Sequence, residues 1–260
     1  RHVPTVPTGL WLAARYSWHM PFLAIGGLGV LVIFCIIFWV PPVNKHLVAG
    51  QPKGNPLDVL TNIFNTPNQM RALTLSIVLM MGHFSIIPFI APALVGNAGF
   101  QQDQIFLIYL VGGALTIFSS PLVGRIADQR GKYPIFVVFA LFSLIPILLI
   151  TNLTPTPLWI VLAISGMFFI AANGRMIPTQ AIVSGVVSPQ QRGGFMSINS
   201  SVQQLSTGIA ANIAGAIVSE GPNGRIEHYN WVGYFSIVLI TASIFLAKRV
   251  KPLEEVRSEK

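Results

Sequence analysis

Residues 20–40 read MPFLAIGGLGVLVIFCIIFWV, a run without a single charged side chain. A helix that crosses ~30 Å of hydrocarbon needs about 20 apolar residues, because each residue rises ~1.5 Å along the axis. A membrane β-barrel would instead show segments of about ten residues with alternating polarity. This stretch therefore predicts a transmembrane helix.

The same pattern returns along the rest of the chain. Arg175 is the one formal charge in all the predicted spans together. The sequence thus predicts an all-α membrane protein with seven transmembrane helices. The seven predicted spans are Met20–Val40, Leu73–Val95, Ile105–Val123, Ile135–Thr151, Leu158–Pro178, Ile198–Val218 and Trp231–Ala247.

Composition supports a membrane location and excludes several classes of protein. The 260 residues are 53% hydrophobic and 9% charged, whereas an ordinary soluble domain carries about 25% charged residues. The net charge of +8 comes from basic residues in short segments between apolar runs, which predicts contact with a lipid bilayer and not with nucleic acid. The single cysteine, Cys35, lies inside an apolar run. We therefore expect neither a metal site nor a bound cofactor.

Every second connection between predicted spans is rich in basic residues, and this pattern predicts how the protein is oriented in the membrane. They follow the first, third, fifth and seventh predicted spans, whereas the intervening connections carry few. Because cytoplasmic loops are enriched in Lys and Arg, residues 41–72, the Gly124–Lys132 connection and the basic tail 248–260 are predicted to be cytoplasmic.

The longest connection, residues 41–72, predicts a boundary between two helical bundles. Within it Asn55 caps a short predicted amphipathic helix with Pro56 at its first position. Residues 1–40 then belong to one bundle, residues 73–247 form a six-helix bundle, and residues 248–260 are the tail. One span before the linker and six after it indicate a truncated twelve-span protein, whose missing N-terminal half is the expected partner.

Residues 121–132, PLVGRIADQRGK, resemble the G-x-x-x-D-x-R-G-K/R loop of the major facilitator superfamily. Residues 9–12 and 17–22 look like the end of that family's fifth helix and the entry to its sixth. Residues 189–193, PQQRG, are similar to the stretch before its eleventh helix, and residues 173–178, NGRMIP, look like its drug:proton antiporter and sugar-efflux branch. The resemblance covers nearly the whole chain and implies a multi-pass protein of the bacterial inner membrane.

The 121–132 motif also has a chemistry of its own. Gly124 permits close backbone approach, Asp128 favours a neighbouring helix N-terminus, and Arg130 or Lys132 bonds the last carbonyls of another helix. Contacts made in only one of two packings shift an equilibrium between inward and outward states. The alternative is a generic basic loop that anchors helix ends. The residues of this predicted conformational latch are Gly124, Arg125, Asp128, Arg130, Gly131 and Lys132.

His83 is a candidate for proton transfer. It lies ten residues into a predicted span, ~15 Å deep and close to the bilayer midplane, and an imidazole exchanges protons under mild conditions. The alternative is a neutral histidine bonded to a carbonyl, Ser or Gln. In the same span Pro88 and Pro92 predict a kink, which is either an outer gate or a passive bend.

Polar side chains inside spans are costly and by default face the interior or a wet cavity. Arg175 lies ~25 Å from the start of its span, where it either reaches cytoplasmic water, binds an anionic or hydroxyl group of cargo together with Asn173, or pairs with a carboxylate. Asn199 and Gln203 line a cavity or bond between helices, and Thr116 is a weaker cavity candidate.

These features predict a secondary transporter that moves a small organic molecule by alternating access, with proton-coupled efflux as the expected mode. A sugar or organic-acid permease on the same fold is the alternative. A seven-helix receptor, a non-transporting membrane scaffold and an enzyme fit less well, because the last span has no lysine for a retinal Schiff base and no catalytic dyad lies at plausible depth. We expect residues 1–260 alone to be unstable and not to transport.

Overall fold

In this computed structural model the described residues are 12, 16–39, 61 and 63–253, in two parts, residues 1–54 and 55–260. The first part contains α2 (Met20–Trp39), which matches the first predicted span to within one residue. The predicted linker helix lies mostly outside the described residues, although positions 63–65 are helical and Ile63 is buried.

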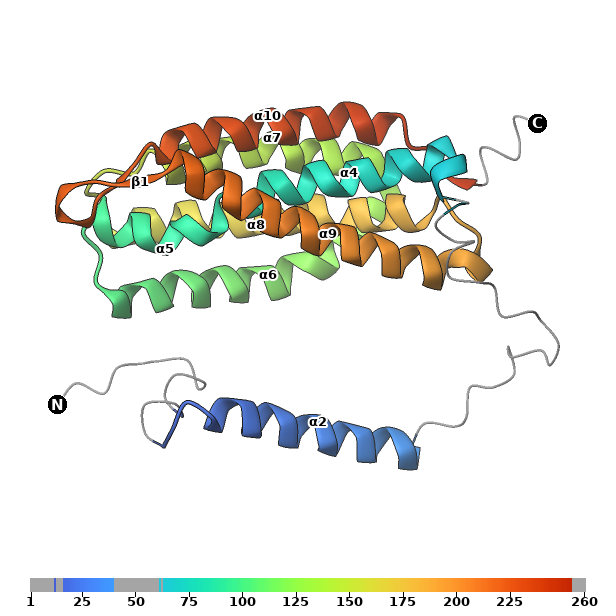
Figure 1. Cartoon of the computed structure of the whole chain (residues 1–260), viewed down its shortest axis with the longest axis horizontal. Helices are drawn as coiled ribbons and strands as arrows, with labels where there is room; N and C mark the ends of the chain where they lie inside the picture. The colour runs from blue at the N-terminus through green and yellow to red at the C-terminus, as the bar shows by residue number, and fades with distance from the viewer. Residues whose placement is uncertain (1–11, 13–15, 40–60, 62, 254–260) are drawn as a thin grey trace. The chain divides into compact units, whose positions relative to one another are not determined.

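The second part is a bundle of long helices (Figure 1). α8 packs extensively on α6 and α7, while α4 packs mainly on α9 and α10, and α10 also lies against α7. A continuous apolar core connects these helices. The helices are α4 (Pro67–Phe84), α5 (Ile87–Gly96), α6 (Gln102–Arg130), α7 (Lys132–Thr151), α8 (Leu158–Ser184), α9 (Pro189–Ile217) and α10 (Tyr229–Lys248).

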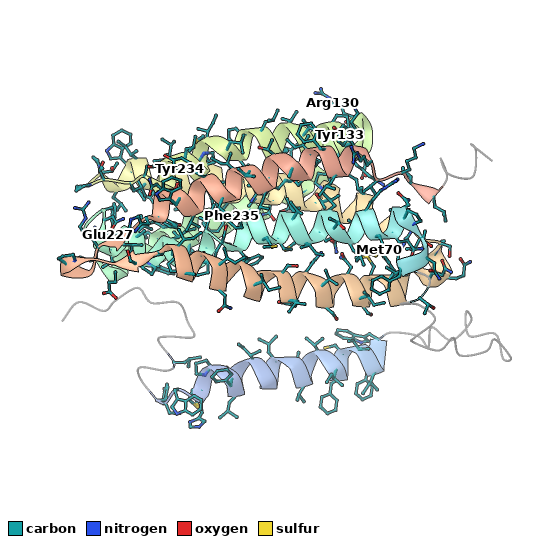
Figure 2. The ribbon with its side chains drawn as sticks, turned by 45° about the horizontal axis from the view of Figure 1, so that its top comes forward. Met70, Arg130, Tyr133, Glu227, Tyr234 and Phe235 are labelled. Atoms are coloured by element: carbon teal, nitrogen blue, oxygen red, sulfur yellow. The ribbon has the colours of Figure 1, made fainter. Side chains whose placement is uncertain are left out.

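The two ends of the bundle differ in chemistry. Met70, Arg130 and Tyr133 lie toward one end, and Glu227 and Tyr234 lie toward the other (Figure 2). We call the first the basic end, because α4 and α9 begin there and α6, α8 and α10 end there. The other end, called the hairpin end, carries a feature that the sequence analysis did not predict: a two-stranded antiparallel hairpin of β1 (Ser219–Glu220) and β2 (Ile226–Glu227), joined by η1 (Pro222–Gly224).

Six helical segments among the described residues are long and apolar enough to cross a membrane. α4 and α5 together make one of them, Pro67–Gly96. The predicted span Ile198–Val218 lies in α9, which is helical over 29 residues but is not among the six. The predicted count of seven spans is therefore not reached by this criterion, because α9 carries many Ser, Asn, Gln and Gly residues.

The 121–132 motif is not a loop, which corrects the prediction. α6 continues through Gly124 and Asp128 to Arg130, and α7 begins at Lys132. Gly131 alone joins them, with a φ of 93° that L side chains rarely adopt. Gly124 lies inside α6 with open space where a Cβ would be, so no close approach within the described part of the chain explains this glycine.

Candidate substrate and proton site

Arg175 lies at the centre of a buried polar cluster between α4, α7 and α8. Its side chain has no exposed surface. Nη1 donates to Ser143 Oγ at 2.7 Å, and Nη2 lies 3.0 Å from His83 Nδ1. The guanidinium therefore connects three helices, and the prediction that Arg175 reaches water at a helix end does not describe this state of the protein.

Helix geometry explains why Arg175 meets His83. Side chains on a helix lean toward its N-terminus, so the head group of Arg175 points away from the basic end, where α8 finishes. Phe168, seven residues earlier on the same face of α8, stacks on the His83 ring with centroids 5.7 Å apart and planes 17° apart. Both residues of α8 thus reach the same histidine.

A glycine brings α7 close enough to complete the cluster. A Cβ at Gly174 would overlap the ring of Phe139 on α7. Phe139 lies one helical turn before Ser143, so this close approach places the Ser143 hydroxyl beside Arg175. Ser143 in turn donates to the carbonyl of Ala140 at 2.7 Å, which leaves its oxygen lone pairs for the guanidinium.

The hydrogen-bond chemistry assigns the tautomer of His83. A guanidinium has five N–H donors and no acceptor. Nδ1 of His83 must therefore accept the bond from Arg175 Nη2, and the proton of the neutral ring is on Nε2. Protonation of Nδ1 would remove this acceptor and place a second positive charge beside Arg175. Proton uptake at His83 and the Arg175 contact are therefore mutually exclusive in this geometry.

The charge of Arg175 has no compensating anion among the residues that the structure describes. No acidic side chain there is bonded to Arg175, and both partners are neutral. The acidic side chains that the structure describes belong to Asp128, Glu220 and Glu227, which lie in the end of α6 or in the hairpin. A buried charge without a counter-charge is costly unless another group supplies one.

Several buried polar atoms near this level of the bundle have no hydrogen-bond partner. They are Arg175 Nε, Ser76 Oγ, Ser165 Oγ and both side-chain polar atoms of Asn199. Ser76 lies two helical turns from His83 on the same face of α4, and Asn199 is fully buried on α9, which packs against α4. α4 and α9 begin at the same end of the bundle (Figure 1), so Ser76 and Asn199 lie at similar depths, ~14 and ~15 Å from their helix starts.

The other predicted pathway residues do not join the cluster. Asn173 is half-buried and lies ~200° around α8 from Arg175, because the two are two residues apart. Gln203 on α9 and Thr116 on α6 are also half-buried. The carbonyl of Thr116 accepts a bond from Ser120 at 2.6 Å. His83, Arg175 and the unpartnered Asn199 are thus the predicted residues that share the buried interior.

The helix that carries His83 is interrupted just beyond it. α4 ends at Phe84 and α5 begins at Ile87, with Pro88 and Pro92 in α5. The carbonyls freed at the break are bonded by α10: Ser236 Oγ donates to Gly82 O, and Tyr229 Oη donates to Ile86 O at 2.9 Å. The break therefore has replacement hydrogen bonds, and a gating role for the two prolines is a proposal.

The predicted latch residues lie exposed at the basic end. Arg125, Asp128, Arg130 and Lys132 are exposed, and none of their side chains forms a hydrogen bond or ion pair within the described part of the chain. Lys132 lines a cavity of about 480 Å³ together with Ser188 and Arg192. The predicted contacts of this motif with another helix end are thus not made by the described residues.

Sequence reasoning missed Ser143 and two asparagines. Ser143 is the only polar side chain in the run 135–150, a signal that marks it as a candidate. Asn68 bonds the backbone of Lys251 through both side-chain atoms, at 2.6 and 3.0 Å. Asn97 bonds Ile226 in the same way, at 2.9 and 2.8 Å. Each joins chain segments more than a hundred residues apart, which sequence spacing does not reveal.

Bundled apolar helices around a buried polar cluster define a polytopic membrane protein. Residues 5–176, more than half of the chain, match the Major Facilitator Superfamily. The chain therefore belongs to this superfamily.

The chain is also similar to two curated proteins. It is 22% identical over 254 residues to the uncharacterized MFS-type transporter YbcL of Bacillus subtilis (strain 168), a match that covers 97% of this chain and 62% of that protein. It is 24% identical over 218 residues to the transcription regulatory protein OpdE of Pseudomonas aeruginosa, which covers 83% and 52%. The chain thus spans between half and two thirds of the length of these relatives.

Proposed function

We propose that this chain forms part of a secondary active transporter that moves a small organic molecule by alternating access, with efflux driven by proton exchange. The observation that carries the proposal is the fully buried contact between Arg175 and His83. An ionisable pair inside a membrane-spanning bundle is costly and is kept mainly where protons or substrates pass. Similarity to an MFS-type transporter supports the same function.

The complete transporter would contain a second helical half that faces this one, since the relatives are longer than the chain. In that arrangement Arg125, Asp128, Arg130 and Lys132 would contact the other half at the cytoplasmic side and act as the latch. Pro88 and Pro92 would let α5 move against α4 as an outer gate. Asn199, Gln203 and Asn173 would line the pathway with Thr116.

An organic-acid permease is the second candidate, and one observation favours it over a sugar permease. Arg175 has a buried positive charge without an anionic partner in the described residues. Neutral sugars would leave that charge uncompensated, whereas an organic acid brings its own carboxylate.

Proton movement in proteoliposomes tests the proposal without knowledge of the cargo. The full-length protein is reconstituted with the pH-sensitive dye pyranine inside, and a panel of neutral, cationic and carboxylate compounds is added. We expect one chemical class to produce a proton flux. His83→Gln, which keeps an acceptor for Arg175 but cannot carry a proton, should abolish the flux, whereas His228→Gln in the exposed hairpin should not. A flux unchanged in His83→Gln removes His83 from the mechanism, and no flux with any compound contradicts proton-coupled transport.

A further inference from the structure

We infer that Arg175 binds a carboxylate group of the transported molecule and that His83 takes up a proton when this carboxylate binds. The inference rests on the organic-acid permease, the second candidate under the proposed function, and names the chemistry of its cargo; in this form the acid and the proton move together instead of being exchanged. It starts from the charge balance of the cluster, in which a permanently charged guanidinium is fully buried between two neutral partners. A carboxylate at this position would neutralise the charge.

The free donors of Arg175 match a carboxylate. Nη1 is held by Ser143, while Nε has no partner. Nε–H and one Nη2–H lie side by side on one edge of the planar group, and two such parallel donors bind the two oxygens of a carboxylate. Lysine cannot present this pair of donors. As the carboxylate binds, the planar guanidinium shifts toward it as a unit, so that Nη2 moves out of hydrogen-bond distance of His83 Nδ1.

The unpartnered groups of the neighbouring helices extend the site. Asn199 offers an amide with two donors and an acceptor, and Ser76 offers a hydroxyl. They lie on α9 and α4 at similar depths, and α4 also carries His83. A second polar group on the same molecule would satisfy these atoms. The site thus fits a carboxylate that has a further hydrogen-bonding group.

Proton uptake at His83 follows from the exchange of partners. In the empty site Nδ1 accepts from Arg175, and a proton there would face a cation. With a carboxylate bound, Nδ1 is released and the charge of Arg175 is balanced, so a proton from solution is accepted at Nδ1. By linkage the proton strengthens carboxylate binding by the same factor.

Among the described residues Arg175 is the charged group that faces His83. The elements packed on α4 are α5, α8, α9 and α10. From α8 come Arg175 and the uncharged Phe168. The buried faces of α5 and α9 carry no titratable group. From α10 the titratable Tyr229 is bonded to the carbonyl of Ile86.

Binding of matched acids and amides to the full-length protein in detergent tests the inference. The probes are acetate, benzoate and succinate, each compared with its amide by the shift in melting temperature and by calorimetry. At least one acid should bind more tightly than its amide by about tenfold or more, as a charge-assisted bidentate contact requires. If no acid binds better than its amide, the inference is wrong.

Variants locate the binding to Arg175. Arg175→Gln should abolish the preference for the acid. Arg175→Lys keeps the charge and should weaken the preference, so it serves as the test if the Gln variant does not fold. Arg225→Gln in the exposed hairpin is the matched control and should bind as the parent does. A preference for the acid that survives in folded Arg175→Gln would overturn the assignment.

Calorimetry in two buffers of different ionisation enthalpy counts the protons taken up. About one proton per carboxylate should enter the parent protein, and none should enter His83→Gln, which still binds the acid. Uptake unchanged in His83→Gln overturns the role of His83. Acid binding without any transport would refute the proposed function alone, whereas transport of a neutral compound that survives in Arg175→Gln would refute this inference alone.

Discussion

The two sides of α4 are built differently. On the side of α10, polar groups are paired: Asn68 and Asn97 each bond the backbone near an end of α10 twice, and Ser236 and Tyr229 bond the carbonyls at the helix break. On the side of α8 and α9, Ser76, Asn199 and the Nε of Arg175 are buried without partners.

This difference separates a structural surface from a candidate working surface. A buried polar group without a partner destabilises the fold, whereas a paired one is close to neutral or favourable. We therefore interpret the contact between α4 and α10, where the polar groups are paired, as a rigid structural interface, called the joint below. We interpret the unpaired groups as sites for ligands that come and go, and the following variants test that contrast.

The largest effect should come from filling the joint between α4 and α10. A Cβ at Gly82 would lie 3.2 Å from Ile240 Cγ1 and 3.3 Å from the carbonyl oxygen of Ser236. Gly82→Leu should therefore separate the helices and lower the free energy of unfolding by about 3 kcal/mol, seen as a lower melting temperature. Gly193→Leu, where the space is open, should change it little; equal losses would show that α4 and α10 are not tightly packed.

Removal of Ser143 should act on transport more than on stability. Ser143→Ala leaves Arg175 Nη1 without its acceptor, a hydrogen bond to a charged group worth about 2 kcal/mol, so the transport rate should fall ~30-fold. Ser243→Ala is the matched control, since the Ser243 hydroxyl donates only within its own helix to Ile240 O. Similar transport rates in the two variants would contradict a positioning role for Ser143.

Loss of one hydrogen bond at the helix break should have a moderate effect on stability. Tyr229→Phe leaves the buried carbonyl of Ile86 without its donor and should cost about 1.5 kcal/mol. Tyr234→Phe on the same helix is the control, because Tyr234 is 42% exposed and forms no hydrogen bond with the described residues. Chemical denaturation of both variants measures the difference, and an unaffected Tyr229→Phe would mean that the joint does not depend on this bond.

The smallest effect should have the opposite sign. Asn199→Leu removes two unpaired polar atoms and fills the same space, so it should raise the free energy of unfolding by about 1 kcal/mol while lowering transport. Asn212→Leu on the exposed face of α9 is the comparison. A destabilised Asn199→Leu would show that Asn199 has a structural partner.

Much of the fold was predictable because hydrophobic run length is a local signal. The predicted span Met20–Val40 agrees with α2 (Met20–Trp39), and Ile135–Thr151 lies within α7 (Lys132–Thr151). The resemblance of residues 121–132 to a loop gives the wrong local structure, because charged residues are also favourable at an exposed helix end and α6 continues to Arg130. The turn requires only Gly131.

The sequence was enough to predict which residue types form the site, but not which side chains contact one another there. His83 and Arg175 attract attention because polar groups in apolar spans are rare. Their contact joins positions 92 residues apart, and no periodicity within one helix indicates which helices pack together. The burial of Arg175 was equally hidden, because it depends on the lean of the side chain and on the close approach at Gly174.

The turn at Gly131 has a practical consequence for protein engineering. One residue with a φ of 93° connects α6 to α7, so adding amino acids there would replace a one-residue turn whose geometry fixes how the two helices meet. An epitope tag or fluorescent reporter at this turn should therefore misfold the protein. The turn at Pro222–Gly224 is no freer a place for such a label, because the carbonyl of Gly224 packs against Gly96 of α5.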